Sequence, residues 1–262
     1  MMIVTPKKFL GQHFLKDLNI ARSIAESLEI TKPTKVLEIG PGMGVLTQFL
    51  LQNENIDLQV VELDRESVAY LQENFPALEG RIIEGDFLKM DLSKLYGEGD
   101  LFVIGNYPYN ISSQIFFKVL ANRDHIPVCS GMIQKEVAER IAAAPGTKAY
   151  GILSVLLQAF YDIEYLFTVH EYVFDPPPKV KSAVIRMKRN SVSKLDCDET
   201  LFAQVVKTGF NQRRKMMRNS LQPILGKDNP VYQLPLFTKR PEQLSVAEFV
   251  ELTNIVAKNK VP

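Results

Sequence analysis

The chain has 262 residues, of which 46% are apolar, so it is long enough to bury one large core or a main domain with a smaller companion. Its net charge is +1, and two cysteines, Cys129 and Cys197, are too few and too far apart for a disulfide framework. Its three histidines lack zinc-ligand spacing, and no apolar run suits a signal peptide or a membrane span. We therefore expect a folded cytoplasmic protein with no membrane partner and no metal.

Short β-rich runs alternate with helical patterns along the first two thirds of the chain. Helices are expected near residues 17–28, 45–52, 65–74, 113–121, 135–143 and 152–160. Strands are expected at residues 35–39, 59–63, 81–84, 101–105, 128–133, 164–169 and 182–188. This alternation predicts a doubly wound, Rossmann-like α/β sheet. The last two strands adjoin without a helix between them, so we expect that pair to be antiparallel.

The last part of the chain has a different pattern. From about residue 191 the strand pattern disappears, and three or four helical segments follow, broken at Pro223, Pro230, Pro235 and Pro241. The stretch 245–248 has the pattern of a capping box that opens the last helix. The sequence therefore predicts a main α/β domain over residues 1–190 and a small all-α domain over residues 191–262.

Basic residues concentrate between residues 179 and 218, where eleven Lys and Arg stand against three acids. Such an excess favours a polyanionic partner, most simply nucleic acid, although a solvated basic face is the alternative. The block from Arg213 to Arg218 has spacings that spread charge around a helix. The candidates for phosphate contacts are Lys179, Lys181, Arg213, Arg214, Lys215 and Arg218.

A glycine-rich turn, residues 38–44, lies between the first core strand and its helix and can let a ligand approach the backbone. By itself it fits a dinucleotide nearly as well as another cofactor. Glu62 closes the next strand, where a carboxylate can accept from ribose hydroxyls, and Asp86 follows the third, where it can accept from an adenine amino group. A carboxylate at Glu38 would repel a pyrophosphate but suits a sulfonium cation, so S-adenosyl-L-methionine is favoured over NAD.

The tetrapeptide 106–109, Asn-Tyr-Pro-Tyr, ends the fourth core strand. An amide acceptor beside a stacking ring is what a planar, amino-bearing base needs. If the Asn106 side chain and the Tyr107 carbonyl accept the two amine protons, the nitrogen is oriented toward a methyl donor, and no strong base is required. Tyr109 would then stack on the base.

Several blocks together resemble the KsgA-type ribosomal RNA small-subunit adenine dimethyltransferases. The match runs from residue 9 to residue 221, well beyond a shared fold. Two positions depart from the usual pattern of that family, which often has Leu at Tyr107 and Asn at His13. The matching blocks are residues 9–15, 38–44, 106–112, 134–137, 148–151, 174–184 and 212–221.

The resemblance implies a class I methyltransferase fold with a seven-stranded mixed sheet and a small helical domain. It implies dimethylation of two adjacent adenosines near the 3' end of small-subunit (16S) ribosomal RNA in a late 30S precursor, by a chain that we expect to be monomeric. It further implies that Phe174 covers the second face of the target base. The residues that it assigns to cofactor binding are His13, Leu15, Gly40, Glu62, Asp86 and Asn106.

Three alternatives remain open on the sequence. The first is a resistance-type methyltransferase acting on large-subunit RNA, although a more basic chain is then expected. The second is a non-catalytic ribosome-assembly factor on the same fold, which has no need of Asn106, Tyr109, Glu62 and Asp86 together. A small-molecule dehydrogenase is the third.

Overall fold

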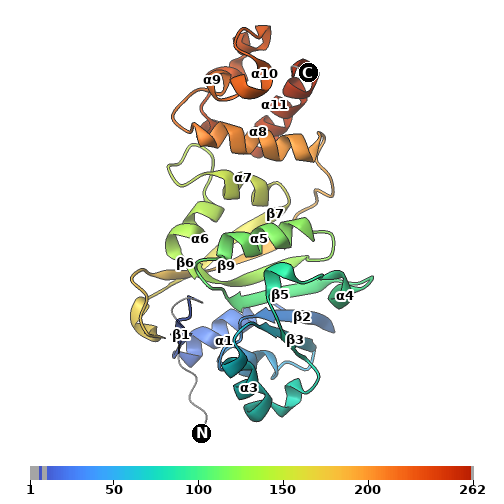
Figure 1. Cartoon of the computed structure of the whole chain (residues 1–262), viewed down its shortest axis with the longest axis vertical. Helices are drawn as coiled ribbons and strands as arrows, with labels where there is room; N and C mark the ends of the chain where they lie inside the picture. Colours follow the sequence, from blue (N-terminus) through green and yellow to red (C-terminus); the bar gives the residue numbers. More distant parts are fainter. Residues whose placement is uncertain (1–5, 8–10, 261–262) are drawn as a thin grey trace. The chain divides into compact units, whose positions relative to one another are not determined.

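The computed structural model describes residues 6–7 and 11–260, and the chain forms two compact units (Figure 1). The first unit comprises Met1–Ala138 and Ile163–Arg189, and the second comprises Glu139–Asp162 and Asn190–Pro262. One junction thus falls at the division expected near residue 190, and the second unit also takes residues 139–162. Separate functions for residues 1–190 and 191–262 stay a prediction.

A seven-stranded mixed sheet in the order β4-β3-β2-β5-β6-β9-β7 forms the centre of the first unit, as expected. β2 pairs in parallel with β3 and β5, the β3–β4 and β5–β6 pairs are also parallel, and β9 runs antiparallel to β6. The chain therefore reverses its direction of travel across the sheet between β2 and β5. The strands are β2 (Thr34–Ile39), β3 (Ile56–Glu62), β4 (Ile82–Glu84), β5 (Leu101–Asn106), β6 (Val128–Gln134), β7 (Tyr161–Val169) and β9 (Ser182–Arg189).

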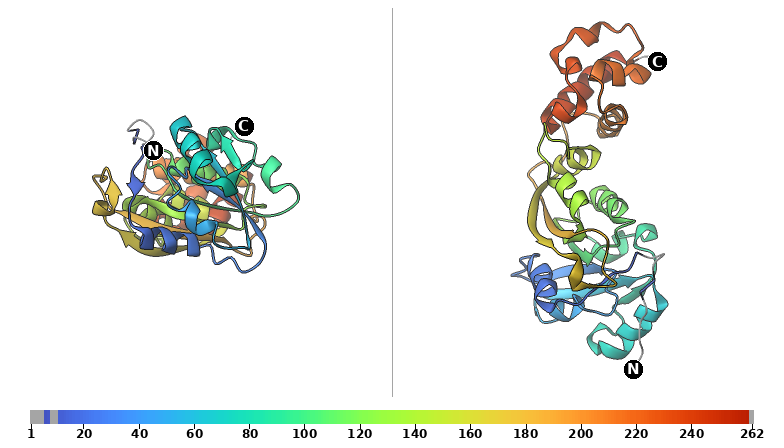
Figure 2. Two further views of the ribbon diagram at one scale, coloured as in Figure 1. Left: turned by 90° about the horizontal axis from the view of Figure 1, so that it is seen from below. Right: turned by 90° about the vertical axis from the view of Figure 1, so that its left-hand side faces the viewer.

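Two of the helices connecting these strands, α1 and α3, begin at side-chain caps. The Asp17 carboxylate accepts from the N–H groups of Asn19 and Ile20, and Asp64 accepts from that of Glu66, so orphan donors of the first turns of α1 and α3 are satisfied. Figure 2 gives two further views of these elements. The helices are α1 (Leu18–Glu26), α2 (Thr47–Leu50), α3 (Arg65–Asn74), α4 (Ser93–Tyr96), α5 (Ser112–Ala121) and α6 (Lys135–Ala142), with short 3-10 turns η2 (Pro76–Leu78), η3 (Phe87–Lys89) and η4 (Glu171–Val173).

The core is continuous across the parallel strands. Successive residues such as Val36 and Leu37 are both buried, because a parallel sheet is covered on both faces. Ala21 and Ile24 of α1 belong to the same apolar cluster as Val36. A rigid sheet of this kind holds the ends of its strands in fixed positions, which is what a site built there requires.

A two-stranded antiparallel ribbon lies apart from the main sheet. β1 (Phe14–Leu15) pairs with β8 (Phe174–Asp175), with Leu15 opposite Phe174. The Lys16 N–H donates to the Val173 carbonyl at 2.8 Å and extends the ribbon. Two-residue strands have too short a pattern for recognition in a sequence, so β1 and β8 were not predicted.

The second unit is helical. Its helices are α7 (Ile152–Gln158), α8 (Glu199–Asn211), α9 (Met217–Ser220), α10 (Gln222–Leu225) and α11 (Val246–Asn259). Three of the four predicted breaks open short 3-10 turns: η5 (Pro230–Gln233), η6 (Pro235–Thr238) and η7 (Pro241–Gln243). Ser245 and Glu248 form the predicted capping box at the start of α11.

The basic block from Arg213 to Arg218 does not lie on one helix, so that expectation was wrong. α8 ends at Asn211, and the Lys215 N–H donates to the Gln212 carbonyl at 2.7 Å in a turn. Arg213, Arg214 and Lys215 therefore lie in the loop between α8 and α9, whereas Arg218 is on α9. The spacing of basic residues over six positions cannot reveal this turn, because backbone hydrogen bonds close it and the side chains take no part.

Candidate active site

A cavity of about 260 Å³ opens at the carboxyl ends of β2, β3 and β5, where the strand order reverses. Open α/β sheets bind ligands at such a switch point. Its walls include seven of the eight residues predicted for the cofactor and the reaction. These are His13, Leu15, Gly40, Glu62, Asp86, Asn106 and Tyr109.

The glycine-rich turn forms one wall of the cavity. The Gly40 N–H donates to the Val61 carbonyl at 2.9 Å, which holds the turn against β3. Gly44 has φ +76°, and a Cβ atom there would lie 2.3 Å from the Phe75 ring, so only glycine fits. The turn thus brings backbone into the cavity with little side chain between it and a ligand.

Glu62 is 5% exposed at the end of β3. Its carboxylate accepts from the N–H groups of Gly42 at 3.1 Å and of Leu63 and Asp64 at 2.9 Å. Burial raises the pKa of Glu62, against the effect of these backbone donors. A carboxylate offers about four acceptor positions, so a ligand hydroxyl can still be accepted while the carboxylate is held firmly in place.

Glu38, at the end of β2, is 1% exposed and lines the same cavity. The Thr47 hydroxyl donates to its Oε2 at 2.7 Å. Burial, with a smaller contribution from the nearby Glu62 charge, raises the pKa of Glu38 to about 8. The cavity therefore has two buried acids, and a cationic ligand would stabilise their ionised forms.

Asp86 follows β4 and is the N-cap of η3, where it accepts from the Leu88 N–H at 3.0 Å. An ion pair with Lys89 spans 3.6 Å. The apolar side chains that follow, Phe87 and Leu88, also line the cavity and were missed in the sequence. An acid next to apolar walls suits a purine ring with an exocyclic amino group. The sequence signal that could have revealed them is the apolar pair Phe87 and Leu88 directly after the acid Asp86.

Asn106, at the end of β5, has a defined orientation. Its side-chain Nδ2 donates to the His13 carbonyl at 3.3 Å. Among residues 6–7 and 11–260, none donates to the Asn106 Oδ1. Because the donor half of the amide is engaged, the acceptor half is left for a ligand N–H. An incoming amine, whose N–H groups donate hydrogen bonds, requires such an acceptor.

Tyr107 points away from this chemistry. Its buried ring packs edge-on against Phe116 at 5.7 Å, and its hydroxyl donates to the Ser130 carbonyl at 2.7 Å. The ring passes over glycines of two neighbouring strands: a Cβ atom at Gly105 or Gly131 would lie 2.9 or 2.6 Å from it. The departure at this position therefore concerns packing, while Tyr107 remains part of the cavity wall.

Tyr109 is already in contact with another ring. The His13 imidazole stacks on it with centroids 5.5 Å apart and an angle of 26° between the planes. The His13 Nδ1 donates to the Pro176 carbonyl at 2.8 Å, and the Tyr109 hydroxyl shares a hydrogen bond with that of Ser182. Ser182 is 73 residues away in the chain, so only the fold shows this partner.

Phe174 is not brought to Tyr109. It is 1% exposed, belongs to the apolar core cluster and is not part of the cavity wall. Its link to the site is indirect, through the pairing of β8 with β1. A role for Phe174 in stacking on the target base stays a prediction and requires the ribbon to shift.

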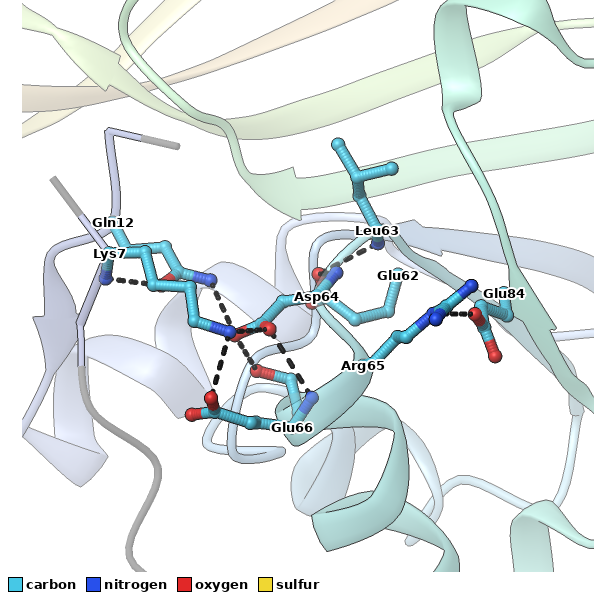
Figure 3. A network of polar contacts seen from close by, with 9 residues as sticks. Lys7, Gln12, Glu62, Leu63, Asp64, Arg65, Glu66 and Glu84 are labelled. Atoms are coloured by element: carbon cyan, nitrogen blue, oxygen red, sulfur yellow. Dashed lines mark hydrogen bonds and ion pairs between the residues drawn. The ribbon is translucent and has the colours of Figure 1, made fainter. Parts of the chain in front are cut away.

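A polar network ties the N-terminal segment to the end of β3 (Figure 3). Lys7 forms an ion pair and hydrogen bond with Asp64, whose side chain is 1% exposed, and a second ion pair with Glu66 at 3.2 Å. The Gln12 amide donates to Asp64 at 3.4 Å. Burial acts to raise the pKa of Asp64, but the bonds to Lys7 and Gln12 outweigh it and hold the pKa below its usual value. Phe9 and Leu10 of the first family block lie outside the described residues.

The predicted phosphate-binding residues fall in both units. Lys179 and Lys181 are exposed between β8 and β9 of the first unit. In the second unit Arg214, Lys215 and Arg218 are exposed, and Arg213 is partly anchored by donation to the Thr147 carbonyl at 3.2 Å. RNA contacts by all six remain predictions.

The part of the chain that the structure describes, residues 6–7 and 11–260, has neither a membrane-spanning helix nor a metal cluster. No helix there is long and apolar enough to span a membrane. No cluster of three or more His, Cys, Asp or Glu has the arrangement of a metal site within the same residues.

Comparison with known proteins agrees with this geometry. The family model described as "Ribosomal RNA adenine dimethylase" matches residues 4–258. A Parabacteroides distasonis protein named "Ribosomal RNA small subunit methyltransferase A" is 70% identical over 259 residues, 99% of this chain and 97% of the relative. A Porphyromonas gingivalis protein of the same name is 60% identical, covering 97% and 98% of the two chains.

Solved structures share the fold. A dimethyladenosine transferase from Plasmodium falciparum has a TM-score of 0.78 at 24% identity, covering 94% of this chain and 98% of its own. The 23S rRNA methyltransferase ErmE has a TM-score of 0.67 at 24% identity, covering 92% and 99%. These likenesses confirm the class I methyltransferase fold. With its family model matched from residue 4 to residue 258, the chain belongs to the ribosomal RNA adenine dimethylase family.

Proposed function

We propose that this protein transfers methyl groups from S-adenosyl-L-methionine to the 6-amino groups of two adjacent adenosines near the 3' end of 16S ribosomal RNA. The observation that carries the proposal is the orientation of Asn106, whose Nδ2 is bonded to the His13 carbonyl and whose Oδ1 accepts from none of residues 6–7 and 11–260. Membership of the adenine dimethylase family identifies the acceptor as adenine.

The residues of the cavity fit the cofactor. Glu62 can accept from ribose hydroxyls, Asp86 from the adenine amino group, and the turn at Gly40 leaves room for the amino-acid part. The buried acids Glu38 and Glu62 suit a ligand with a net positive charge. When bound, S-adenosyl-L-methionine supplies a methyl group attached to a positively charged sulfur.

The chain acts by positioning the amine. Its nitrogen is a poor nucleophile because the lone pair is delocalised into the purine ring. Asn106 Oδ1 and the Tyr107 carbonyl accept its two N–H groups and point the lone pair at the methyl group, which is electrostatic stabilisation without a general base. Methyl transfer would form the N–C bond as the bond from the methyl carbon to the sulfonium sulfur breaks, which would leave a neutral thioether, and the methylated amine would then give up one proton to solvent.

Tyr109 holds the base by stacking. In the structure His13 covers one face of that ring, so the base must stack on the opposite face or displace His13. Burial raises the pKa of the Tyr109 hydroxyl, and the bond to Ser182 fixes the ring, so it stays neutral and oriented. Stacking on a fixed ring contributes on the order of 1 to 3 kcal/mol per base.

The experiment that tests the function is transfer of tritium from labelled cofactor. We expect labelling of 30S precursor particles at two adjacent adenosines, mapped by mass spectrometry, and none of free large-subunit RNA. Labelling of the large-subunit RNA alone would establish the resistance-type alternative. Absence of transfer to either RNA, with cofactor binding intact, would favour a non-catalytic assembly factor.

The particle stage, a late 30S precursor, belongs to the same proposal, as do a monomeric state and a cytoplasmic location. Relatives with up to 70% identity carry the name of small-subunit methyltransferases, which supports ribosomal RNA of the small subunit as the substrate.

The exposed pair Arg214 and Lys215 offers a test of RNA binding by the second unit. Replacing both with Ala should weaken particle binding and reduce the slope of log affinity against log salt by about 2, because each phosphate contact contributes about 1. The rate at saturating particle should not change. Filter binding at several salt concentrations measures this. The matched control replaces Lys227 and Lys258, two other exposed lysines of this unit, and an equal loss there would mean that only net charge matters.

A further inference from the structure

A second pair of stacked rings lies outside the cavity. The rings of His170 and Tyr172 stack with centroids 5.5 Å apart and an interplanar angle of 20°. Both residues are exposed, and Tyr172 has 70% of its surface in contact with solvent. Single exposed apolar side chains are ordinary, but a stacked pair presents a flat, pre-ordered aromatic face.

This pair is joined to the site through the β1–β8 ribbon, whose β8 strand belongs to the yellow segment that lies beside the blue β1 in Figure 1. Val173, next to Tyr172, accepts from the Lys16 N–H, and Pro176 accepts from the His13 ring that stacks on Tyr109. Tyr172 and Pro176 are four residues apart, so their Cα atoms are at most about 15 Å apart. A few nucleotides of RNA cover such a distance.

The charges around the rings are mixed. Lys16, Lys179 and Lys181 are exposed on the ribbon or the segment that follows β8, whereas Glu171 and Asp175 carry the opposite charge. Attraction of phosphates alone therefore gives little affinity here. Stacking of a base does not depend on net charge, because every base has a π face.

We propose that His170 and Tyr172 form a stacking platform for an unpaired base of the RNA that flanks the target adenosine. The inference rests on the proposed function, since it assumes that RNA occupies the neighbouring cavity. The platform holds the strand on one side of the extruded base and so favours its entry. The site binds a nucleobase, with no requirement for its identity.

The test uses the full chain, S-adenosyl-L-methionine and 30S precursor particles. Tyr172→Ala should raise KM for the particle on the order of 10-fold, with kcat and the cofactor Kd unchanged. Tyr172→Phe should keep the wild-type KM, because stacking needs the ring and not the hydroxyl. Phe117→Ala, which removes another exposed ring of this unit, is the control and should have no effect.

A second experiment identifies the partner. Binding of the wild-type chain and of Tyr172→Ala is measured with an RNA hairpin that contains the two adenosines. In a series of hairpins, one flanking base at a time is removed. At one position base removal and Tyr172→Ala should be non-additive, since either change abolishes the same stack. Additive effects at every position would overturn the platform. An effect of Tyr172→Ala seen with particles but not with the hairpin would also overturn it, because the partner would then be a ribosomal protein. Absence of methyl transfer by the wild-type chain would contradict the proposed function instead.

Discussion

Replacement of Asn106 by Ala is expected to lower the rate of methyl transfer by about 100-fold or more, with little change in particle binding. One pre-organised hydrogen-bonding group at a reacting centre contributes on this scale, and the loss falls on kcat. Single-turnover transfer of labelled methyl groups to 30S precursor measures the rate. Undiminished turnover would remove Asn106 from the reaction.

The amide also donates to the His13 carbonyl, so a second variant separates its two roles. Asn106→Asp keeps acceptor oxygens but has no donor for His13. If anchoring of the N-terminal segment is what matters, both variants should weaken cofactor binding in calorimetry. If acceptance from the amine matters, Asn106→Ala should bind the cofactor nearly normally. Asn74→Ala, an exposed amide of α3, is the control and should retain full activity.

The second large effect concerns pH. The pKa of Glu38 is raised from 4.5 to about 8, so the native state holds a proton between these values that the unfolded chain has released. The native state then binds more protons, and the free energy of unfolding falls as pH rises through this window, by at most about 1.4 kcal/mol per pH unit. Denaturant unfolding of the cofactor-free protein between pH 5 and 8 measures the slope.

Glu38→Gln should flatten that slope, because the amide does not titrate, whereas Glu73→Gln at an exposed position should leave it unchanged. A positive charge in the cavity lowers the pKa of Glu38. Binding of S-adenosyl-L-methionine near pH 7 should therefore release up to one proton, and S-adenosylhomocysteine, which lacks the sulfonium charge, should release less. Calorimetry in buffers of different ionisation enthalpy detects this. An unchanged slope in Glu38→Gln would mean that Glu38 is ionised in the native state.

The gathering of the predicted cofactor residues around one cavity could be foreseen from the sequence, whereas their contacts with a cofactor stay a prediction. Glu62 and Asn106 end their strands and Asp86 follows one, and parallel strands bring their carboxyl ends to one edge of the sheet. Their convergence on one cavity follows from the fold class. The periodic strands and the capping box of α11 were predictable for the same reason, since local pattern determines them.

The base side was less predictable, because its contacts join distant segments. No local pattern indicates that Tyr109 bonds to Ser182 or that His13 stacks on Tyr109. Burial of Phe174 depends on pairing with Leu15, across 159 residues of chain. The turn at Arg213 was missed because charges at helical spacing look alike in a helix and in a loop.

The ring of Tyr107 has a consequence for how the protein can vary. It lies over Gly105 and Gly131, on adjacent strands, and a methyl group at either glycine would collide with it or with backbone. The backbone contacts are the closer ones, because a Cβ atom would lie 2.6 Å from the Ile39 carbonyl oxygen at Gly105 and 2.2 Å from the Gly105 carbonyl oxygen at Gly131. Both glycines should therefore persist in descendants of this chain even where a smaller side chain replaces Tyr107. A branch that adopts Leu at this position loses the hydrogen bond to Ser130 and the ring contact with Phe116 without gaining freedom at the two glycines.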